Sequence, residues 1–575
     1  QAGALSCIPW AALSVPATLH ASLLARLDRL GPVAKEVAQK GAAIGREFGY
    51  ELLAAIADQP DPELRQALDR LTGAGLLFAR GAPPQSTYLF KHALVQDAAY
   101  GTLVRNRRQQ LHARIAEELE RCSPEMVASR PEVLAHHLTE AGLAEQALEF
   151  WSKAGTLALA RSAPQEATAH FGRALRVAAT LPPMEALKRR ELALQGGLSA
   201  ALSLARGLAA PEVEQAQLRA RELAAELGDG EGWFRAQWGL WRVHSGRAQT
   251  PRALGAAHEL LAAAERDRDS GHLLEAQHAL WTSLLFRGEF AAARMRAEAG
   301  LALYDPDRHG GHAFLYGDHD PGECALSQGG NALWFLGYPE QALRWQDEAL
   351  ALSERLGLPQ VLAHTLNWTA IRAQLAGDLP RLEVQVERVT RLAVEHGFAN
   401  WFPEARILAG WLAAHRDRDR AALGPMRDHM ERRSGTGTAL ASTWLWLVLA
   451  DACLAVGTNA EAIGAAREGL AGAEATEERF CEAELHRVHA AALLAHDQML
   501  LPAAEQALMA AVKAARGRGA RMSELRAAVE LARLWAERGA RRGAYDLLAP
   551  LQGWFTEGLD TPDLREAKRL LDTLL

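Results

Sequence analysis

The segment WSKAGTLALARSAPQEATAHFGRAL, residues 151–175, decides the fold of most of the chain. Its spacing is W-x3-G-x11-A-x3-F-x2-A, set by Trp151, Gly155, Ala167, Phe171 and Ala174. Glycine and alanine are needed where two helix backbones approach each other, and the aromatic side chains fill the hollows beside that contact. The segment therefore predicts a closely packed pair of antiparallel helices.

The same pattern recurs along the rest of the chain, at intervals of 46, 40, 40, 49, 40, 40, 40, 42 and 40 residues. Positions equivalent to Ala167 are Val213, Ala253, Ala293, Ala342, Leu382, Ala422, Ala462, Ala504 and Ala544. A step near 40 exceeds the roughly 34 residues of a common tetratricopeptide repeat, which predicts helices that are longer by most of a turn.

Glycines precede many of these positions by five to seven residues, where the turn inside each pair belongs. They are Gly246, Gly288, Gly337, Gly377, Gly457 and Gly539. Residues 130–575 are therefore predicted to form a tetratricopeptide-like superhelix of about ten helix pairs, right-handed, in which each pair contacts mainly its neighbours.

Residues 17–125 have a different organisation. A first helix over 17–30 ends at Gly31-Pro32, and further helices are expected near 33–44, 48–57 and 61–74. Two short apolar segments then flank Gly81-Ala82-Pro83-Pro84, as in a β-hairpin. The expected fold class is all-α: a linker over 1–16, a small winged-helix domain over 17–125, and the helical superhelix.

Many winged helices bind DNA, so the charge of the candidate recognition helix at 61–74 matters. It holds two basic and three acidic residues, a net charge of −1. A helix that reads a DNA groove carries excess positive charge, so DNA binding is not expected. The arginines at 105, 107, 108 and 114 lie largely off the apolar stripe of the next helix and are interpreted as a solvated face.

The composition excludes several classes of protein. A net charge of −7 over 575 residues attracts the chain to neither nucleic acid nor an anionic membrane. Five cysteines without paired zinc spacing indicate reduced thiols in the cytoplasm. No stretch is long and apolar enough for a membrane span, because Asp451 interrupts STWLWLVLADACLAV. The chain begins at Gln1, from which we expect a fragment or a processed product.

Two irregular stretches of the sequence could carry chemistry. YDPDRHGGHAFLYGDHDPGEC, residues 304–324, gathers His309, His312 and His319 with Asp318 and Asp320. The spacing matches no metalloprotein motif, and a solvated insertion between repeats contains such residues anyway, so no metal is expected and the three histidines stay the candidate ligands.

A second stretch, WFRAQWGLW, concentrates three tryptophans on one predicted helix: Trp233, Trp238 and Trp241. They are interpreted as core rather than as the lining of a groove. The sequence also has no GxxxxGK[ST] phosphate loop and no supported catalytic constellation, so this chain is not expected to be an enzyme or to hold a cofactor.

Several stretches together resemble the C-terminal portion of bacterial proteins that join a class III adenylate/guanylate cyclase, a STAND-type AAA ATPase and a tetratricopeptide tail. They are VPATLHASLLARLDRL, QKGAAIGREFGYELLAAI, FKHALVQDAAYGTLV, YDPDRHGGHAFLYGDHDPG and the terminal segment from Glu524 to Leu575. The resemblance implies ATP or ADP at an ATPase domain that would precede Gln1.

The resemblance also implies a role for one histidine. In STAND ATPases a histidine of the winged-helix domain contacts the bound diphosphate, which makes His92 the matching residue, with Lys91 as a helper. The alternative is that His92 only caps a helix or packs in a half-buried seam.

The predicted function is the non-catalytic, regulatory portion of a nucleotide-dependent signalling protein. Its superhelix would bind a protein or peptide partner or a small-molecule signal. Alternatives are the sensor region of a STAND transcription regulator and a free-standing tetratricopeptide adaptor.

Overall fold

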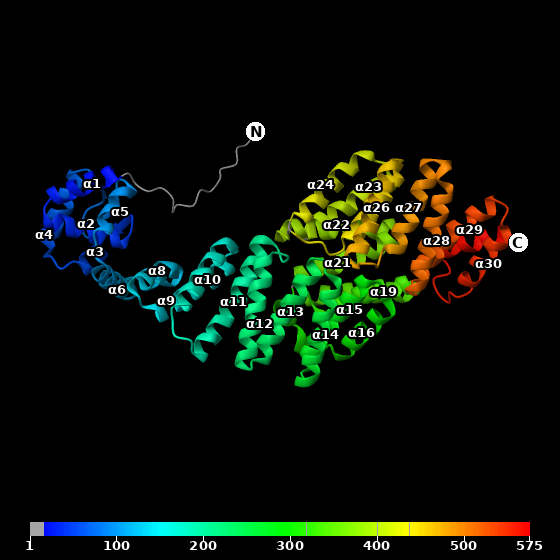
Figure 1. Ribbon diagram of the computed structural model, residues 1–575, viewed down its shortest axis with the longest axis horizontal. Coiled ribbons are helices and arrows are strands. Elements are labelled where there is room, and N and C mark those ends of the chain that lie inside the picture. The colour runs from blue at the N-terminus through cyan, green and yellow to red at the C-terminus, as the bar shows by residue number, and fades with distance from the viewer. Residues whose placement is uncertain (1–16, 318, 399–400, 436) are drawn as a thin grey trace. The chain divides into compact units, whose positions relative to one another are not determined.

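The computed structural model describes residues 17–317, 319–398, 401–435 and 437–575 (Figure 1). The chain divides into two compact units, residues 1–201 and 202–575. Three short strands lie near the start of the described chain, and every other regular element in the described ranges is helical.

The first hundred described residues combine helices with a small sheet. In chain order the elements are α1 (Ala17–Arg29), α2 (Pro32–Ile44), β1 (Glu47–Gly49), α3 (Tyr50–Ile56), α4 (Asp61–Gly73), β2 (Leu77–Arg80), β3 (Thr87–Phe90) and α5 (Ala93–Gly101). The predicted hairpin is present as β2 and β3, which pair antiparallel with Phe78 opposite Leu89.

The sheet also contains β1, which the sequence analysis missed. β1 pairs with the other side of β3, so the strand order is β1-β3-β2. Its Phe48 stacks on Tyr88 with ring centroids 5.7 Å apart. Phe48 also packs on Gly41 of α2, where an added Cβ would lie 2.6 Å from the ring. A three-residue strand is too short to show an alternating pattern in the sequence. The interpretation of residues 17–125 as a winged-helix domain stays a prediction.

The first unit continues with antiparallel helices. The predicted boundary between the winged-helix domain and the superhelix, at 125–130, lies among them and stays a prediction. They are α6 (Arg105–Cys122), α7 (Pro124–Ser129), α8 (Pro131–Ala141), α9 (Ala144–Ala160), α10 (Pro164–Ala178) and α11 (Glu185–Arg206).

The quoted segment forms α9 and α10. Trp151 and Gly155 lie on α9, and Ala167, Phe171 and Ala174 lie buried on α10. The Phe171 ring occupies the space that a Cβ would need at Gly155, 2.7 Å away. The absence of a side chain at Gly155 thus lets this ring pack directly against the α9 backbone.

The second unit consists of helix pairs and forms a tetratricopeptide-like α-solenoid. Its elements are α12 (Pro211–Leu227), α13 (Gly230–Gly246), α14 (Thr250–Asp267), α15 (Ser270–Arg287), α16 (Phe290–Leu303), α17 (Pro306–His309), α18 (His312–Leu315), α19 (Pro321–Leu336), α20 (Pro339–Leu356), α21 (Pro359–Leu375), α22 (Leu379–His396), α23 (Trp401–Arg416), η2 (Arg420–Ala422), α24 (Leu423–Ser434), α25 (Ser442–Ala455), α26 (Asn459–Thr476), α27 (Glu482–His496), η3 (Gln498–Leu500), α28 (Leu501–Gly517), α29 (Arg521–Glu537), α30 (Arg541–Gln552) and α31 (Pro562–Leu574).

The repeated small positions lie on the second helix of successive pairs. Their exposed fractions are 0–2% at Ala167, Val213, Ala253, Ala293, Ala342, Leu382, Ala462, Ala504 and Ala544. Ala422 differs, because it ends the 3-10 turn η2 and is only half-buried. There Met426 of α24 takes the buried place against Gly410.

The predicted turn glycines mostly adopt a left-handed backbone. Gly288, Gly337, Gly377, Gly457 and Gly539 have φ between 67° and 94°. Gly246 instead ends α13, and the left-handed position passes to Ala248, whose φ is 51°. The turn therefore tolerates alanine at some cost in backbone strain.

Most helix contacts in the second unit join neighbouring elements, and a few join distant repeats. The Phe286 carbonyl at the end of α15 accepts hydrogen bonds from the backbone N–H of Arg479 and Phe480, at 2.8 and 3.2 Å. Glu557 accepts from the backbone N–H of Glu340 and Gln341 at the start of α20, at 2.9 and 3.0 Å. Distant repeats thus pack against the ends of α15 and α20.

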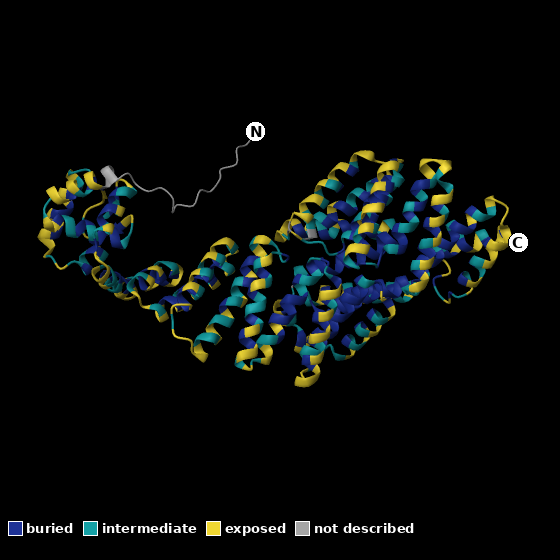
Figure 2. Cartoon of the chain, viewed as in Figure 1, coloured by how far each residue is buried: buried dark blue, intermediate teal, exposed yellow. Residues whose placement is uncertain are grey.

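These contacts between distant repeats, called the closure below, bury the first helix of several pairs on nearly all sides. In α15 every residue from 274 to 286 is buried, and in α19 every residue from 321 to 335. Figure 2 shows the buried residues gathered on this part of the second unit. Trp238 and Trp241 of α13 are 3% and 5% exposed, and Trp233 packs against the same core, so the three predicted core tryptophans lie where expected.

Candidate functional site

A groove of about 900 Å³ lies in the first unit, between helices α6, α8, α9 and α10. Its lining combines four arginines and two glutamates with the indole of Trp151. The arginines are Arg105, Arg108, Arg173 and Arg176, and the glutamates are Glu132 and Glu140. The groove therefore carries a net positive charge in a chain that is acidic as a whole.

Trp151 is fixed at the wall of this groove. Its indole N–H donates to the Thr139 hydroxyl at 2.9 Å, and its ring stacks on His170. The Arg173 guanidinium lies 4.8 Å from the centre of the Trp151 ring. Such an arginine holds a cation–π contact and still presents N–H donors to a ligand.

The arginines of the groove are available for an anion. Within the part of the chain that the structure describes, none of the four forms an ion pair. Arg108 lies 4.3 Å from the centre of the Tyr100 ring and donates to the Leu103 carbonyl, but its Nε has no acceptor. The expected solvated face of arginines is therefore divided, because Arg107 and Arg114 pair with Asp58 while Arg105 and Arg108 line the groove.

Two buried histidines pack next to the residues that line this groove. His112 and His137 are 1% and 2% exposed and face each other with their Nδ1 atoms 2.8 Å apart. The Tyr100 hydroxyl lies 2.9 Å from His112 Nε2. Burial lowers the pKa of His112 to about 4 and that of His137 to about 3, so both rings are neutral at neutral pH.

This pair predicts that acid destabilises the first unit. Because both histidines have a lower pKa when folded, the unfolded chain binds more protons below its own histidine pKa of about 6.5. We expect the stability of the unit to be full above pH 6.5 and to fall towards pH 4, by on the order of 2 kcal/mol for each histidine. Hydrogen exchange of α6 and α8, corrected for intrinsic rates, measures this loss.

A double variant provides the control. His112→Gln together with His137→Gln removes both rings and should reduce the dependence of α8 protection on pH between 6.5 and 4, leaving the part due to His136, whose pKa burial also lowers. An unchanged pH dependence in this variant would contradict the assignment to this pair.

The predicted nucleotide-sensing residues lie at the start of α5. His92 is the exposed N-cap residue, and its side chain makes no capping hydrogen bond. Lys91 is exposed beside it, with its ammonium 5.5 Å from the centre of the Phe78 ring. The side chain of His92 thus neither caps the helix nor packs in a half-buried seam. Its role towards a nucleotide stays a prediction.

The insertion at 304–324 is not a solvated loop, which corrects that interpretation. It forms α17 and α18 and then the first turn of α19. His309 is 3% exposed and its Nδ1 accepts the backbone N–H of Asp305 at 3.0 Å. His312 donates through Nδ1 to Glu275 of α15 at 2.7 Å. Asp318 lies outside the described residues.

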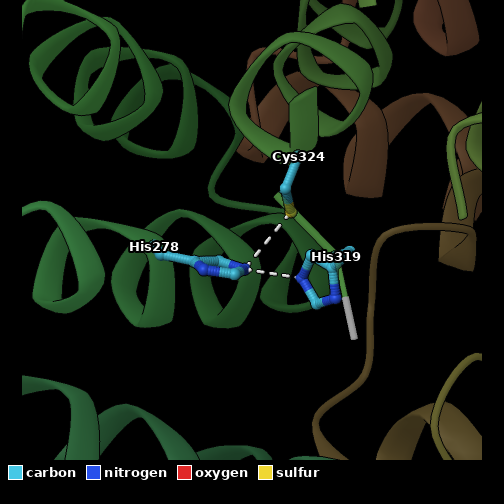
Figure 3. Close-up of side chains that lie close together, drawn as sticks. All are labelled: His278, His319 and Cys324. Carbon is cyan, nitrogen blue, oxygen red and sulfur yellow. Dashed lines mark hydrogen bonds between the residues drawn. The ribbon is translucent and has the colours of Figure 1, made fainter. Parts of the chain in front are cut away.

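His309 and His312 do not meet the third predicted ligand, His319. His319 instead lies against α15, with its Nε2 3.0 Å from His278 Nε2 (Figure 3). The thiol of Cys324, at the start of α19, lies 3.3 Å from the same His278 atom. Of the side chains described, these three form a group whose ligand atoms all lie within 4.8 Å of one another.

Carboxylates surround this group. Asp320 is buried and caps α19 by accepting the backbone N–H of Gly322 and Glu323. Glu275 is fully buried, and although burial opposes its ionisation, hydrogen bonds from His278 and His312 hold its pKa below the ordinary value. Glu323, also fully buried, accepts from His364 Nδ1 at 2.9 Å.

Sequence reasoning missed His278, because it lies 46 residues before Cys324 on another helix. Nothing in the spacing links two helices that meet only after the repeats pack. The signal that was available is the pair His319 and Cys324, five residues apart at the end of the insertion.

Comparisons with known proteins identify only remote relatives. No protein-family model matches the chain. An uncharacterized protein, R02095, from Rhizobium meliloti strain 1021 is 27% identical over 478 residues, which are 81% of this chain. The chain spans 45% of the length of that curated relative.

Two solved structures are similar to the chain at 12% identity. One is a STAND protein with a tetratricopeptide repeat sensor, PH0952, from Pyrococcus horikoshii, with a TM-score of 0.33, over 73% of this chain and 66% of that one. The other is a Rap protein complexed with Competence and Sporulation Factor, with a TM-score of 0.45, over 65% and 94%. No helix in the described ranges has the length and apolar character needed to cross a bilayer.

Proposed function

We propose that this chain is the non-catalytic, partner-binding portion of a nucleotide-dependent signalling protein, and that the groove of the first unit binds an acidic segment of a protein partner. The observation that carries the proposal is the set of four arginines, free of ion pairs in the described structure, around Trp151. Planar guanidinium groups bind carboxylates in a bidentate manner, and the indole supplies apolar contact.

The nucleotide-dependent part of this proposal depends on the resemblance to cyclase and STAND ATPase proteins. On that view residues 17–125 are the winged-helix domain, and His92 with Lys91 would face the nucleotide of an ATPase domain. The exposure of both side chains beside the start of α5 supports this view. Catalysis is not assigned to this chain.

Binding of an acidic peptide tests the groove. The probe is a fluorescein-labelled peptide of alternating glutamate and leucine, followed by fluorescence polarisation, with a lysine and leucine peptide for comparison. We expect the acidic peptide to bind more tightly and its affinity to fall as salt is added, because the contacts are charged and partly exposed. The double variant Arg173→Glu and Arg176→Glu should weaken binding at least about tenfold, or about 1.4 kcal/mol.

Arg161→Glu is the matched control, since Arg161 is exposed at the end of α9 but does not line the groove. It should leave the affinity unchanged. Equal binding of both peptides, or equal loss in the control and the double variant, would contradict the proposal. Binding of a small anion such as inorganic phosphate with displacement of the peptide would instead identify a small-molecule site.

A further inference from the structure

In the second unit His278 and His319 bring their Nε2 atoms within 3.0 Å of each other. His278 Nδ1 lies 3.0 Å from a carboxylate oxygen of Glu275, and His319 Nδ1 lies 2.7 Å from the carbonyl oxygen of Gly317. A carbonyl only accepts, and so does a carboxylate, so both Nδ1 atoms carry the proton. Without a second proton on His278, both Nε2 lone pairs point into the same space, 3.0 Å apart, and can bind one cation.

Both hydrogen bonds are of the kind that orients metal-binding histidines. A ligating imidazole usually donates its other N–H to a carboxylate or a backbone carbonyl, which fixes the tautomer and leaves the lone pair for the metal. His278 has the first arrangement and His319 the second. Cys324, with its sulfur 3.3 Å from His278 Nε2, completes a set of two imidazoles and one thiol.

A buried donor next to this set lacks a well-directed acceptor. The Trp281 ring stacks on His278 with centroids 4.8 Å apart, and packs in one apolar cluster with Cys324. Trp281 is 1% exposed, and its indole N–H lies beside the Cys324 thiol without forming a well-directed hydrogen bond. A metal-bound thiolate is an acceptor of the kind that this N–H lacks, whereas a neutral thiol accepts only weakly.

The charges nearby favour a divalent cation. Glu275 and Glu323 are both 0% exposed on α15 and α19, and a bound thiolate would add a third negative charge. The Arg242 guanidinium also approaches Gly317, next to His319. Each carboxylate already accepts hydrogen bonds from histidines, so a cation would add to this pairing.

We propose that His278, His319 and Cys324 bind a zinc ion that fastens the 304–324 insertion to α15. Imidazole and thiolate are the ligands that zinc prefers. Tetrahedral coordination at the usual bond lengths places two nitrogens about 3.3 Å apart and nitrogen and sulfur about 3.6 Å apart. The distances of 3.0 and 3.3 Å from His278 to His319 and Cys324 need to open by only a few tenths of an ångström, and the ligand atoms of Cys324 and His319 lie within 4.8 Å of each other.

Metal content and cobalt spectra test the site in the whole 575-residue chain under reducing conditions. We expect about one zinc ion per chain to survive dialysis against metal-free buffer. Cobalt(II) in place of zinc should give the thiolate-to-cobalt charge-transfer band together with the intense visible bands of a tetrahedral site. Zinc should also slow hydrogen exchange over residues 305–317.

Four single variants separate ligation from general stability. Cys324→Ser and His319→Gln should lose the bound zinc, and Cys324→Ser should abolish the charge-transfer band. Cys453→Ser removes a buried thiol from another repeat, and His309→Gln changes the insertion without removing a ligand. Both control variants should keep about one zinc ion.

Three outcomes would overturn the proposal. The wild-type chain could fail to bind zinc or cobalt after reconstitution, which would leave only a hydrogen-bonded histidine cluster. The charge-transfer band could persist in Cys324→Ser. Equal loss of metal in the control variants would mean that metal retention follows the stability of the fold rather than these ligands.

Discussion

Gly197→Ala destabilises the first unit by on the order of 1–3 kcal/mol, while the same change at the adjacent Gly196 stabilises it by about 0.5–1 kcal/mol. Both glycines lie inside α11, where alanine is the better helix former. An added Cβ at Gly197 would lie 2.6 Å from the Phe171 ring, whereas at Gly196 it would meet nothing within 4 Å. Two neighbouring and chemically identical changes are thus expected to act in opposite directions.

Native-state hydrogen exchange of α10 measures this pair of changes better than a single melting curve, because the chain has two units and need not unfold in one step. Phe171→Leu should restore part of the stability lost in Gly197→Ala, since the smaller side chain leaves room for the new methyl group. If both glycine substitutions changed the stability in the same direction, or if Phe171→Leu restored none of it, Phe171 would not pack between α9 and α11 as described.

Gly337→Ala is expected to cost more than Gly377→Ala, by on the order of 1–3 kcal/mol. Both glycines follow the first helix of a pair and have positive φ, 94° and 67°, so both variants pay a similar strain of about 1 kcal/mol. Only at Gly337 would the new Cβ collide, at 2.8 Å from Trp554, 2.9 Å from Arg521 and 3.0 Å from Phe555. At Gly377 nothing lies within 4 Å.

The difference between the two variants isolates the closure between distant repeats. Hydrogen exchange of residues 553–557 should rise in Gly337→Ala and stay at the wild-type level in Gly377→Ala. If both variants changed only their own turns, the C-terminal residues would not pack on the end of α19 and the repeats would behave as a nearest-neighbour stack.

Local chemistry in the sequence was sufficient for the helical repeats. Small residues spaced as Gly155, Ala167 and Ala174 permit close helix contacts, and a turn glycine lies within most pairs, so periodicity alone predicted the α-solenoid. The turn residues from Gly81 to Pro84 between two apolar segments likewise predicted the hairpin. These signals are local, because each depends on residues within one or two turns of one another.

Tertiary structure decided the rest. β1, the capping of α20 by Glu557 and the burial of α15 depend on residues that meet only after the chain has folded back on itself. The same is true of the candidate sites. The groove needs arginines from α6 and α10 on one concave face, and His278 reaches Cys324 across 46 residues of sequence. A spacing rule describes one helix or one turn, whereas a site is set by which helix faces are brought together by packing.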